Sequence, residues 1–377
     1  MKKVLVIGAG FAGISAVKIL NKEKNNLQIT LIDQNRISSF LPMLPDVIGR
    51  AVGTETLSCD IKSLSEKMGF AFLEEKVAAV DLQKKEIKTE RQTLDYDYLL
   101  IATGSQTNFY GQENIRKIGY SLDSTCDAQR IVQALKDDKP DVFVIAGGGY
   151  TGIEIATNLR RRYSKTPRNV RIIIIELTEQ ILGPLPQWMK DYVGQNLKRL
   201  AIETLTSCKV EKAQAGEVQL SNGQRLEKAM LIWTAGVRTA DFVFNLNADK
   251  TKQGRIKVDP FLRVNDSSFA AGDTAEFSHA GAPLRMAVQF SIAQAEIAAN
   301  NIINLANGLP LREFRPKDLG YIIPMANNRA CGIILGISFR GYFPTIFHYL
   351  MCAYRSFSFK NKIGVIKAIM PSLFSGG

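Results

Sequence analysis

The segment VLVIGAGFAG, residues 4–13, decides the fold of the first part of the chain. Its leading apolar residues predict a buried strand, and the spacing of Gly8, Gly10 and Gly13 predicts a tight turn from that strand into a helix. In such a turn the first glycine permits the bend, the second lets the backbone approach a pyrophosphate, and the third lets the helix pack on the strand. The segment therefore predicts a dinucleotide site in an α/β fold.

The segment VFVIAGGGYTG, residues 142–152, repeats this pattern later in the chain. Gly147, Gly149 and Gly152 have the same spacing, and an apolar run again precedes them. Two such turns in one chain predict two dinucleotides held by one protein, most simply a flavin and a nicotinamide.

An acidic residue follows each glycine turn at the end of the next expected strand. Asp33 lies twenty residues after Gly13, where its carboxylate can accept hydrogen bonds from both ribose hydroxyls of an adenosine. Glu176 lies twenty-four residues after Gly152, and a carboxylate there favours a free 2′-hydroxyl and repels a 2′-phosphate. The second turn is therefore expected to prefer NADH to NADPH, although either acid by itself would suit a solvated turn.

Three further polar residues are candidates for chemistry. Asp273, in the segment FAAGD at 269–273, is expected to hold a ribityl or pyrophosphate oxygen. Glu154 either lies near a hydride path, where it would orient a carboxamide or relay a proton, or is a helix N-terminal acid stabilised by the helix dipole. Gln289 is expected to face a flavin edge or a carbonyl substrate, and Gln294, on the same helix, either has such a role or is a polar residue on a surface helix.

The composition is that of a folded protein with two or three domains: 377 residues, of which 46% are hydrophobic and 22% charged. The five cysteines show no CxxC motif and the two histidines are far apart, so we expect no disulfide scaffold and no metal site. The N-terminus enters a strand at once, and no window of about 20 apolar residues appears. Neither a signal peptide nor a transmembrane helix is expected, and the cytoplasm is the default compartment.

The last part of the chain is both basic and apolar. The net charge is +12, and no acidic residue follows Asp318. Six basic residues do follow it: Arg329, Arg340, Arg355, Lys360, Lys362 and Lys367. A basic stretch rich in Ile, Leu, Phe, Tyr and Met suits an anionic membrane surface, whereas no recognition motif points to nucleic acid. The alternative is a C-terminal subdomain that packs its apolar face on the core or on a partner subunit.

The order of the motifs predicts that one nucleotide domain is inserted in another. Each half has a glycine turn, an acidic strand end, alternating strands and a short closing turn, and the chain then returns to FAAGD. We therefore expect an α/β fold with two Rossmann-like dinucleotide-binding domains and a C-terminal membrane-associating segment. The expected boundaries are 1–113 with 235–325 for an FAD-binding domain, 114–234 for an NADH-binding domain, and 326–377 for an amphipathic membrane-anchoring region.

Longer motifs make the chain resemble a known family. ATGSQTNFYG (102–111), GGGYTGIE (147–154) and IWTAGVR (232–238) stand in the order found in the two-dinucleotide-binding-domain flavoproteins. More narrowly they are similar to type II NADH dehydrogenases, and the tail LGYIIPMANNRACGIILGISFRGYFPTIFHYL (319–350), followed by YRSFSFKNKIGV (354–365), is similar to their membrane-anchoring segment.

The resemblance implies an enzyme, a non-proton-pumping NADH:quinone oxidoreductase of respiratory electron transport. It implies that NADH passes a hydride to non-covalent FAD and that menaquinone or ubiquinone then receives two electrons. It also implies a peripheral, monotopic protein on the cytoplasmic face of the cell membrane, bound to lipid through its C-terminal region. A second copy of the chain is a further candidate partner.

The resemblance also implies roles for individual residues. The FAD residues would be Gly8, Gly10, Gly13, Asp33, Gly104 and Asp273, with Pro42 beside the flavin ring. The NADH residues would be Gly147, Gly149, Tyr150, Thr151, Gly152, Glu154, Glu176 and Gly236. Glu154 and Gln289 are the candidates for proton traffic and quinone polarisation. Two departures from the family pattern concern the quinone contacts. The family has a second Gln four residues after the first, but this chain has Ala293 there and Gln294 one position later. In addition, FLPMLP replaces the family's usual FTPLL.

Three alternatives stay open. A sulfide:quinone oxidoreductase would need two cysteines at the flavin, but TGIEIATN at 151–158 occupies one expected place, and Cys331 is the remaining candidate. A soluble NADH-dependent reductase of a ferredoxin or small acceptor would keep its activity without residues 326–377. A flavoprotein used as a redox sensor or binding module would show no turnover with NADH and quinone analogues.

Overall fold

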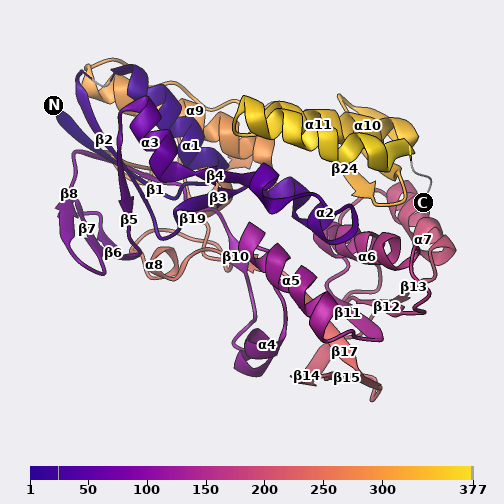
Figure 1. Cartoon of the computed structure of the whole chain (residues 1–377). Helices are drawn as coiled ribbons and strands as arrows, with labels where there is room; N and C mark the ends of the chain where they lie inside the picture. Colours follow the sequence, from indigo (N-terminus) through magenta and orange to yellow (C-terminus); the bar gives the residue numbers. More distant parts are fainter. Residues whose placement is uncertain (24, 375–377) are drawn as a thin grey trace. The chain divides into compact units, whose positions relative to one another are not determined.

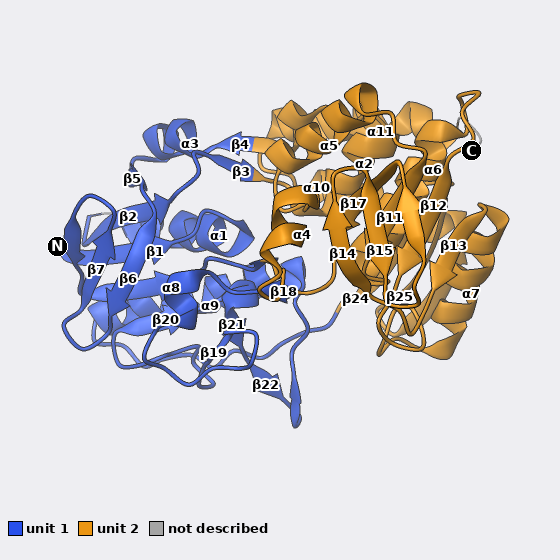
Figure 2. Cartoon of the chain, turned by 90° about the horizontal axis from the view of Figure 1, so that it is seen from below, with its two compact units in different colours: residues 1–38, 59–106, 237–318 blue, residues 39–58, 107–236, 319–377 orange. Residues whose placement is uncertain are grey.

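The computed structural model describes residues 1–23 and 25–374, which form two compact units (Figures 1 and 2). Each unit is built from three separate segments of the chain. Unit 1 comprises Met1–Ser38, Cys59–Gln106 and Val237–Asp318, and unit 2 comprises Ser39–Ser58, Thr107–Gly236 and Leu319–Gly377.

Unit 1 is organised around a parallel sheet in the order β20-β9-β1-β2-β5. These strands are β1 (Lys2–Ile7), β2 (Leu27–Asp33), β5 (Ala71–Glu74), β9 (Tyr98–Ile101) and β20 (Ser268–Ala270). All four neighbouring pairs are parallel, so the carboxyl ends of β1, β2, β9 and β20 meet at one edge of the sheet. Helices α1 (Phe11–Leu20) and α9 (Val288–Ala306) pack against each other beside this sheet.

Smaller elements complete unit 1. They are α3 (Ile61–Met68), the antiparallel strands β6 (Val77–Asp81), β7 (Glu86–Thr89) and β8 (Thr93–Asp95), α8 (Asp241–Phe244), and the short strands β19 (Ile256–Lys257), β21 (Ala275–Glu276), β22 (Ser278–His279) and β23 (Ala282–Pro283). Buried side chains from the parallel sheet and the antiparallel strands form one core, with Leu5, Ile32 and Ile87 among its members.

Unit 2 is organised around a second parallel sheet in the order β13-β12-β11-β17. These strands are β11 (Val142–Ala146), β12 (Arg171–Ile175), β13 (Ile202–Leu205) and β17 (Ala229–Trp233). The other elements of its central part are α4 (Glu113–Ile118), α5 (Thr125–Asp137), α6 (Tyr150–Tyr163), α7 (Gln187–Arg199), and the antiparallel strands β14 (Val210–Gln214), β15 (Glu217–Leu220) and β16 (Arg225–Glu227). Both sheets therefore place a strand, a glycine turn and a helix in succession.

The short helix α2 (Leu44–Gly49), which follows the 3₁₀ helix η2 (Leu41–Met43), belongs to unit 2 because it packs on α6. The contact is close at Gly49, where a Cβ atom would overlap the backbone of Asn158. An early segment of the chain thus joins a unit whose sheet begins about a hundred residues later.

The tail also belongs to unit 2. It consists of the antiparallel strands β24 (Gly320–Met325), β25 (Arg329–Ile334) and β26 (Ile337–Gly341), followed by α10 (Tyr342–Arg355) and α11 (Phe359–Phe374). Figure 1 shows α10 and α11 side by side, in yellow. Ile323, Met325 and Cys331 are part of the same core as β11 and β12, so the hairpin is a structural part of this unit.

The predicted α/β class with parallel sheets is confirmed. The compact units divide the chain elsewhere than the expected boundaries: residues 39–58 and 319–377 group with unit 2, and position 326 lies in the turn between β24 and β25. In the described residues, no helix combines the length and the apolar character needed to cross a bilayer.

Candidate active site

In the first glycine turn, two glycines are closely packed and the third has an open side. Gly8 has φ +102°, and a Cβ atom there would overlap the carbonyl of Ala102. A Cβ atom at Gly13 would overlap the carbonyl oxygen of Gly8, so this glycine lets α1 close onto the turn. At Gly10, in contrast, no described atom lies within 4 Å of the Cβ position. The backbone of Gly10 is therefore open to a ligand, as a pyrophosphate cradle requires.

The second turn repeats this division in unit 2. Gly147 has φ +113°, and a Cβ atom there would lie 2.8 Å from Thr234 Oγ1. A Cβ atom at Gly152 would overlap the carbonyl oxygen of Gly147, whereas the Cβ position of Gly149 has no described atom within 4 Å. Both turns therefore have the form that holds a dinucleotide pyrophosphate at a helix N-terminus.

Asp33 lies at the end of β2, and its side-chain carboxylate binds a backbone amide of the first glycine turn. Its Oδ2 accepts a hydrogen bond from the amide of Ala9 at 2.7 Å, and its Oδ1 accepts one from the amide of Asn35 at 2.8 Å. Burial raises the pKa of Asp33, and these two amides oppose the rise. A carboxylate offers about four acceptor positions, so acceptor capacity is left for ribose hydroxyls.

Glu176, which directly follows β12, makes the equivalent contacts in unit 2. Its Oε2 accepts a hydrogen bond from the amide of Gly148 at 2.8 Å. Its Oε1 accepts from the amide and from the hydroxyl of Thr178, both at 2.9 Å. Each acid therefore binds the residue that follows the first glycine of its turn, at the edge where an adenosine ribose would lie.

Asp273 and Gly104 lie together at the carboxyl edge of the unit 1 sheet. Ser105 Oγ donates to Asp273 Oδ2 at 3.0 Å, and Thr274 Oγ1 donates to the carbonyl of Gly104 at 3.1 Å. Burial raises the pKa of Asp273, while the Ser105 hydroxyl and the charge of Arg255 lower it. The two motifs ATGS and AAGD, far apart in the sequence, therefore form one polar edge next to the first glycine turn.

Gln294 has a structural role that its sequence position did not suggest. It is 2% exposed, and its Oε1 accepts the amide hydrogen of Gly272 at 2.8 Å. The residue is thus a buried link between α9 and the AAGD turn, and not a polar residue on a surface. A buried amide oxygen is satisfied in this way because an unpaired one would be costly.

Gln289 lies in the first turn of α9 and is partly buried. Its Nε2 donates to Asp318 Oδ1 at 3.1 Å, and the guanidinium of Arg285 also binds the Asp318 carboxylate. Asp318 thus fixes the side-chain amide of Gln289, a contact that sequence reasoning missed.

The remaining predicted residues lie in unit 2. Tyr150 and Thr151 are the first two residues of α6, where backbone amides point out of the helix N-terminus. Gly236 has φ +93° and lies against the Tyr110 hydroxyl. Pro42 is in η2, so the structure groups it with the NADH candidates and apart from the other predicted FAD residues, which are in unit 1.

Glu154 lies one turn into α6. Burial, and after it the charge of Asp46 in α2, raises the pKa of Glu154 well above its ordinary value. A protonated carboxyl group next to a glycine turn can act as an acid at neutral pH. Asp46 was not singled out from the sequence, because nothing in FLPMLPDVIGR shows that α2 packs on α6.

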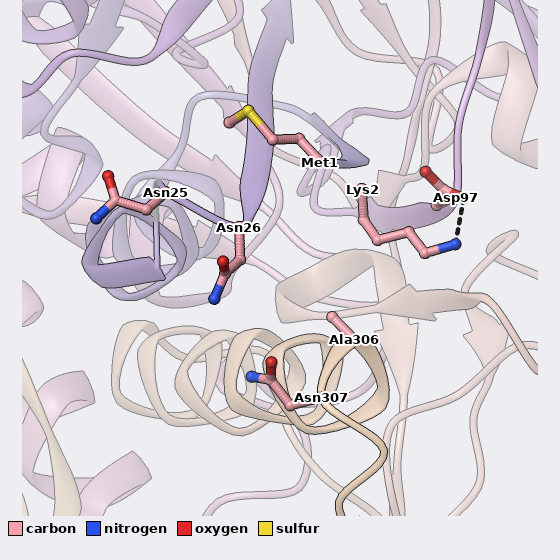
Figure 3. A pocket seen from close by; sticks show the side chains of 7 residues that line it. All are labelled: Met1, Lys2, Asn25, Asn26, Asp97, Ala306 and Asn307. Atoms are coloured by element: carbon pink, nitrogen blue, oxygen red, sulfur yellow. Dashed lines mark hydrogen bonds and ion pairs between the residues drawn. The ribbon is translucent and has the colours of Figure 1, made fainter.

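One open hollow in unit 1, of about 610 Å³, lies away from these residues (Figure 3). It is lined by Met1, Lys2, Asn25, Asn26, Asp97, Ala306 and Asn307. Lys2 begins β1, while Asn26 and Asp97 directly precede β2 and β9. The hollow is therefore at the amino edge of the parallel sheet, whereas the glycine turn is at the carboxyl edge, so we exclude it as the dinucleotide site.

The comparison with family models identifies the class of protein. Residues 2–301 match the pyridine nucleotide-disulphide oxidoreductase family, and the chain belongs to it. Among individual proteins, it is 27% identical over 370 residues to the type II NADH:quinone oxidoreductase of Staphylococcus haemolyticus, covering 90% of this chain and 91% of that protein. It is 26% identical over 365 residues to the protein of that name from Staphylococcus aureus, covering 89% and 90%. The predicted resemblance is thereby confirmed.

Solved structures show the same fold. The structure of NDH2 from Plasmodium falciparum in complex with NADH matches with a TM-score of 0.86 at 18% identity, covering 100% of this chain and 99% of that one. The sulfide:quinone oxidoreductase of Aquifex aeolicus matches with a TM-score of 0.76 at 20% identity, covering 97% and 92%.

Proposed function

We propose that this protein is an NADH:quinone oxidoreductase that holds FAD without a covalent bond. The observation that carries the proposal is the pair of equivalent glycine turns, each with an open second glycine and a carboxylate on the turn. The relatives named type II NADH:quinone oxidoreductase support this choice among the chemistries of the family. When bound, the flavin would supply hydride acceptance from NADH and two-electron donation to a quinone.

In unit 1, we assign the FAD to the first turn. The amides around Gly10 and the N-terminus of α1 would hold the pyrophosphate, and Asp33 would hold the adenosine ribose. Asp273, oriented by Ser105, would accept a hydrogen bond from the ribityl chain. Gly8 and Gly13 would act through packing alone.

In unit 2, we assign NADH to the second turn. The N-terminal amides of α6, at Tyr150 and Thr151, would face its pyrophosphate. Glu176 would accept both ribose hydroxyls, and its charge would repel the 2′-phosphate of NADPH. The backbone at Gly149 and Gly236 would come close to the ligand.

We assign quinone polarisation to Gln289 and proton supply to Glu154. The amide of Gln289 is oriented by Asp318, and an oriented amide can hydrogen-bond a quinone carbonyl. Burial, and after it the charge of Asp46, raises the pKa of the Glu154 carboxyl well above its ordinary value, which favours the protonated form that supplies a proton.

We propose that unit 2 binds the cytoplasmic face of a membrane through the tail. The large apolar side chains that are more than half exposed there are Leu335, Ile337, Phe343, Leu350, Tyr354, Phe359 and Phe374. Exposed basic residues lie on the same elements, at Arg340, Lys360 and Lys367. An apolar helical face with cations beside it suits the boundary between headgroups and acyl chains of an anionic bilayer.

The tail should be tested by point substitutions and not by removal of residues 326–377. Cys331 in β25 is a core residue of unit 2, together with Ile323 and Met325 in β24, so removal of residues 326–377 would disrupt the core of this unit under every interpretation. Leu350→Asp with Phe359→Asp changes only exposed side chains. We expect loss of binding to vesicles of anionic phospholipid, with turnover of a water-soluble quinone analogue retained. Unchanged vesicle binding, or a change of oligomeric state instead, would favour a partner subunit as the cover of this face.

The sulfide:quinone alternative is disfavoured by the thiols. Sulfide chemistry needs a reactive thiolate. Cys331 is fully buried, and burial raises the pKa of its thiol to about 12. Cys352 is also buried, and burial raises the pKa of its thiol well above the ordinary value. Neither group would ionise at physiological pH.

The proposed function is tested by anaerobic spectroscopy of the holoenzyme. We expect NADH to bleach the flavin absorbance, NADPH to do so much more slowly, and sulfide to have no effect. Menaquinone or ubiquinone analogues should then restore the oxidised spectrum. A flavoprotein that NADH cannot bleach, or whose reduced form no quinone reoxidises, would refute the proposal, and rapid reoxidation by ferredoxin alone would favour the soluble reductase.

A further inference from the structure

A buried polar cluster in unit 2 joins three helices. Asp46 comes from α2, Arg50 directly follows α2, Arg161 comes from α6 and Tyr349 from α10, and all four residues are buried. Buried charges are costly unless they are paired and hydrogen-bonded. One member of the cluster, Arg161, is on α6, the helix that also carries Glu154.

The carboxylate of Asp46 is held by a cation and a phenol. Tyr349 Oη donates to Asp46 Oδ1 at 2.8 Å, and Arg50 Nε lies 3.2 Å from the same oxygen. The side chains of Asp46 and Arg50 are 5% and 0% exposed, and the Arg50 guanidinium lies 5.1 Å from the centre of the Tyr349 ring. Burial raises the pKa of Asp46, while the charge of Arg50 and the hydrogen bond from Tyr349 oppose this rise and favour the ionised form.

The two arginines are themselves fixed by the end of the tail. Arg50 Nη1 donates to Ser372 Oγ at 2.7 Å, and its Nη2 donates to Asn328 Oδ1 at 2.8 Å. Arg161 donates to the carbonyls of Ala326 and Ser372, both at 2.8 Å. The carbonyl end of α11 carries the negative end of the helix dipole, so it helps to compensate two buried cations that have one paired carboxylate.

Close packing brings the charge of Asp46 to bear on Glu154. Gly49 lets α2 approach α6 at Asn158, one helical turn after Glu154. A charge in such a packed region acts more strongly than one screened by water. Asp46 accordingly contributes to the raised pKa of Glu154, second to burial.

Asp46 is the anion among the groups that surround Glu154. In the described part of unit 2, the groups that interact electrostatically in this cluster are Asp46 in α2, Arg50 directly after α2, Arg161 in α6, and His348, Tyr349, Cys352 and Arg355 in α10. The other charged and titratable groups on these helices and on α5, which packs on α2, are Tyr150, Arg160, Arg162, Tyr163, Tyr342, Tyr354, Cys126, Asp127, Arg130, Lys136 and Asp137. Burial lowers the pKa of His348 to about 4, and it raises those of Tyr349 and Cys352 well above their ordinary values, so these three groups are neutral at pH 7.

We propose that Asp46 is a positioning residue for Glu154: α2 packs on α6 one helical turn from Glu154, and the Asp46 carboxylate, held by Arg50 and Tyr349, favours the neutral form of the Glu154 carboxyl. The inference rests on the proposed function. Reduction of a quinone to the quinol takes up two electrons and two protons; the hydride of NADH accounts for both electrons and one proton. Glu154 gives the second proton, becomes a carboxylate, and regains a proton from water.

The test is the pH dependence of quinone reduction by the NADH-reduced holoenzyme, followed by rapid mixing with a soluble quinone analogue. The rate of flavin reoxidation should fall at high pH as Glu154 loses its proton, and we call this fall the alkaline limb. Asp46→Asn removes the anionic neighbour of Glu154, so we expect the alkaline limb to begin about one pH unit lower. At pH values above the shifted limb, the reoxidation rate of the variant should be about tenfold below that of the wild type. Flavin reduction by NADH should keep its pH profile. Tyr349→Phe, which removes one hydroxyl, should shift the limb less in the same direction and serves if Asp46→Asn does not fold.

The controls separate this effect from a structural one. Glu154→Gln should abolish the limb, and Asp46→Asn should cause no further shift in that background. Tyr192→Phe is the matched control for Tyr349→Phe, because the Tyr192 hydroxyl has no hydrogen-bond partner in the described residues, and it should leave the limb in place.

The outcomes distinguish the two proposals. If the wild-type enzyme reduces quinone but its alkaline limb is the same in Asp46→Asn and Tyr349→Phe, the role of Asp46 is refuted while the proposed function stands. A limb that persists in Glu154→Gln refutes it equally. If no quinone reoxidises the wild-type enzyme, the proposed function fails and this inference fails with it.

Discussion

The two glycine turns have glycines at the same three positions, but they differ at the residue that follows the first glycine. Unit 1 has Ala9 there, and its amide donates to Asp33 at 2.7 Å. Unit 2 has Gly148, and its amide donates to Glu176 at 2.8 Å. A Cβ atom at Gly148 would lie 2.8 Å from Ile181 and 3.2 Å from Cβ of Glu176. In unit 2, therefore, only a residue without a Cβ atom at position 148 leaves space for the side chains of Ile181 and Glu176.

The turns also differ one step into the following helix. Two residues after the last glycine, α1 has Ser15 and α6 has Glu154. Burial, and after it the charge of Asp46, raises the pKa of Glu154, and α2 packs on the helix that carries it. Our proposal therefore gives the second turn a role in proton supply in addition to ligand binding, whereas it gives the first turn a role in binding alone.

The largest expected effect comes from closing the turns one at a time. Gly13→Ala and Gly152→Ala each place a methyl group into the carbonyl of the first glycine of the same turn. A disruption of about 3 kcal/mol would weaken ligand binding more than a hundredfold. We expect Gly13→Ala to lose FAD on purification and Gly152→Ala to retain it but to reduce it poorly with NADH. Loss of FAD from both variants would contradict the division of labour between the turns.

The second expected effect concerns acid stability and compares the two histidines. Burial lowers the pKa of His348, in unit 2, from 6.5 to about 4, whereas His279, in unit 1, is exposed. Between these pH values the unfolded state binds the proton and the folded state does not, so stability is complete above pH 6.5 and falls as the pH falls toward about 4. The loss amounts to ~3 kcal/mol at most.

Thermal unfolding at pH 7.5 and at pH 5 measures this loss. His348→Gln should reduce the difference in Tm between the two pH values, and His279→Gln should leave it unchanged. An equal reduction in both variants would mean that burial of His348 is not the cause.

The third effect tests the residue that distinguishes the turns. Gly148→Ala should push Glu176 and Ile181 apart and raise KM for NADH about tenfold, a cost of about 1.4 kcal/mol. The reverse exchange in unit 1, Ala9→Gly, adds backbone freedom without a clash and should change FAD affinity by less. Steady-state kinetics and FAD titration of the apoprotein measure the two values, and a larger effect of Ala9→Gly would reverse the comparison.

The smallest expected effect concerns the choice of nicotinamide. Glu176→Gln keeps an acceptor for a ribose hydroxyl but removes the charge that repels a 2′-phosphate. The ratio of kcat/KM for NADH to that for NADPH should fall severalfold, by about 1 kcal/mol or less. Asp33→Asn is the matched change in unit 1 and should weaken FAD without altering this ratio.

Several site features followed from local sequence, and others did not. The glycine turns, Asp33 and Glu176 were predicted because a GxGxxG turn and a strand-end acid are set by neighbouring residues along the chain. For Gln294 the sequence left a site role and a surface position open, and neither predicted its buried hydrogen bond with Gly272, because this partner lies twenty-two residues earlier in the sequence. The cluster of Asp46, Arg50 and Tyr349 was missed for the same reason, since 303 residues separate Tyr349 from Asp46.

The sequence by itself determined the α/β class, both turns and their acids, and the basic apolar composition of the tail, because each depends on short-range periodicity, spacing or charge. Only the tertiary structure decided that residues 39–58 and the tail belong to unit 2, that β24 and β25 contribute to its core, and that Asp46 acts on Glu154. The physical reason is that burial and electrostatic coupling depend on which surfaces pack together. Local spacing in a single sequence does not specify that packing.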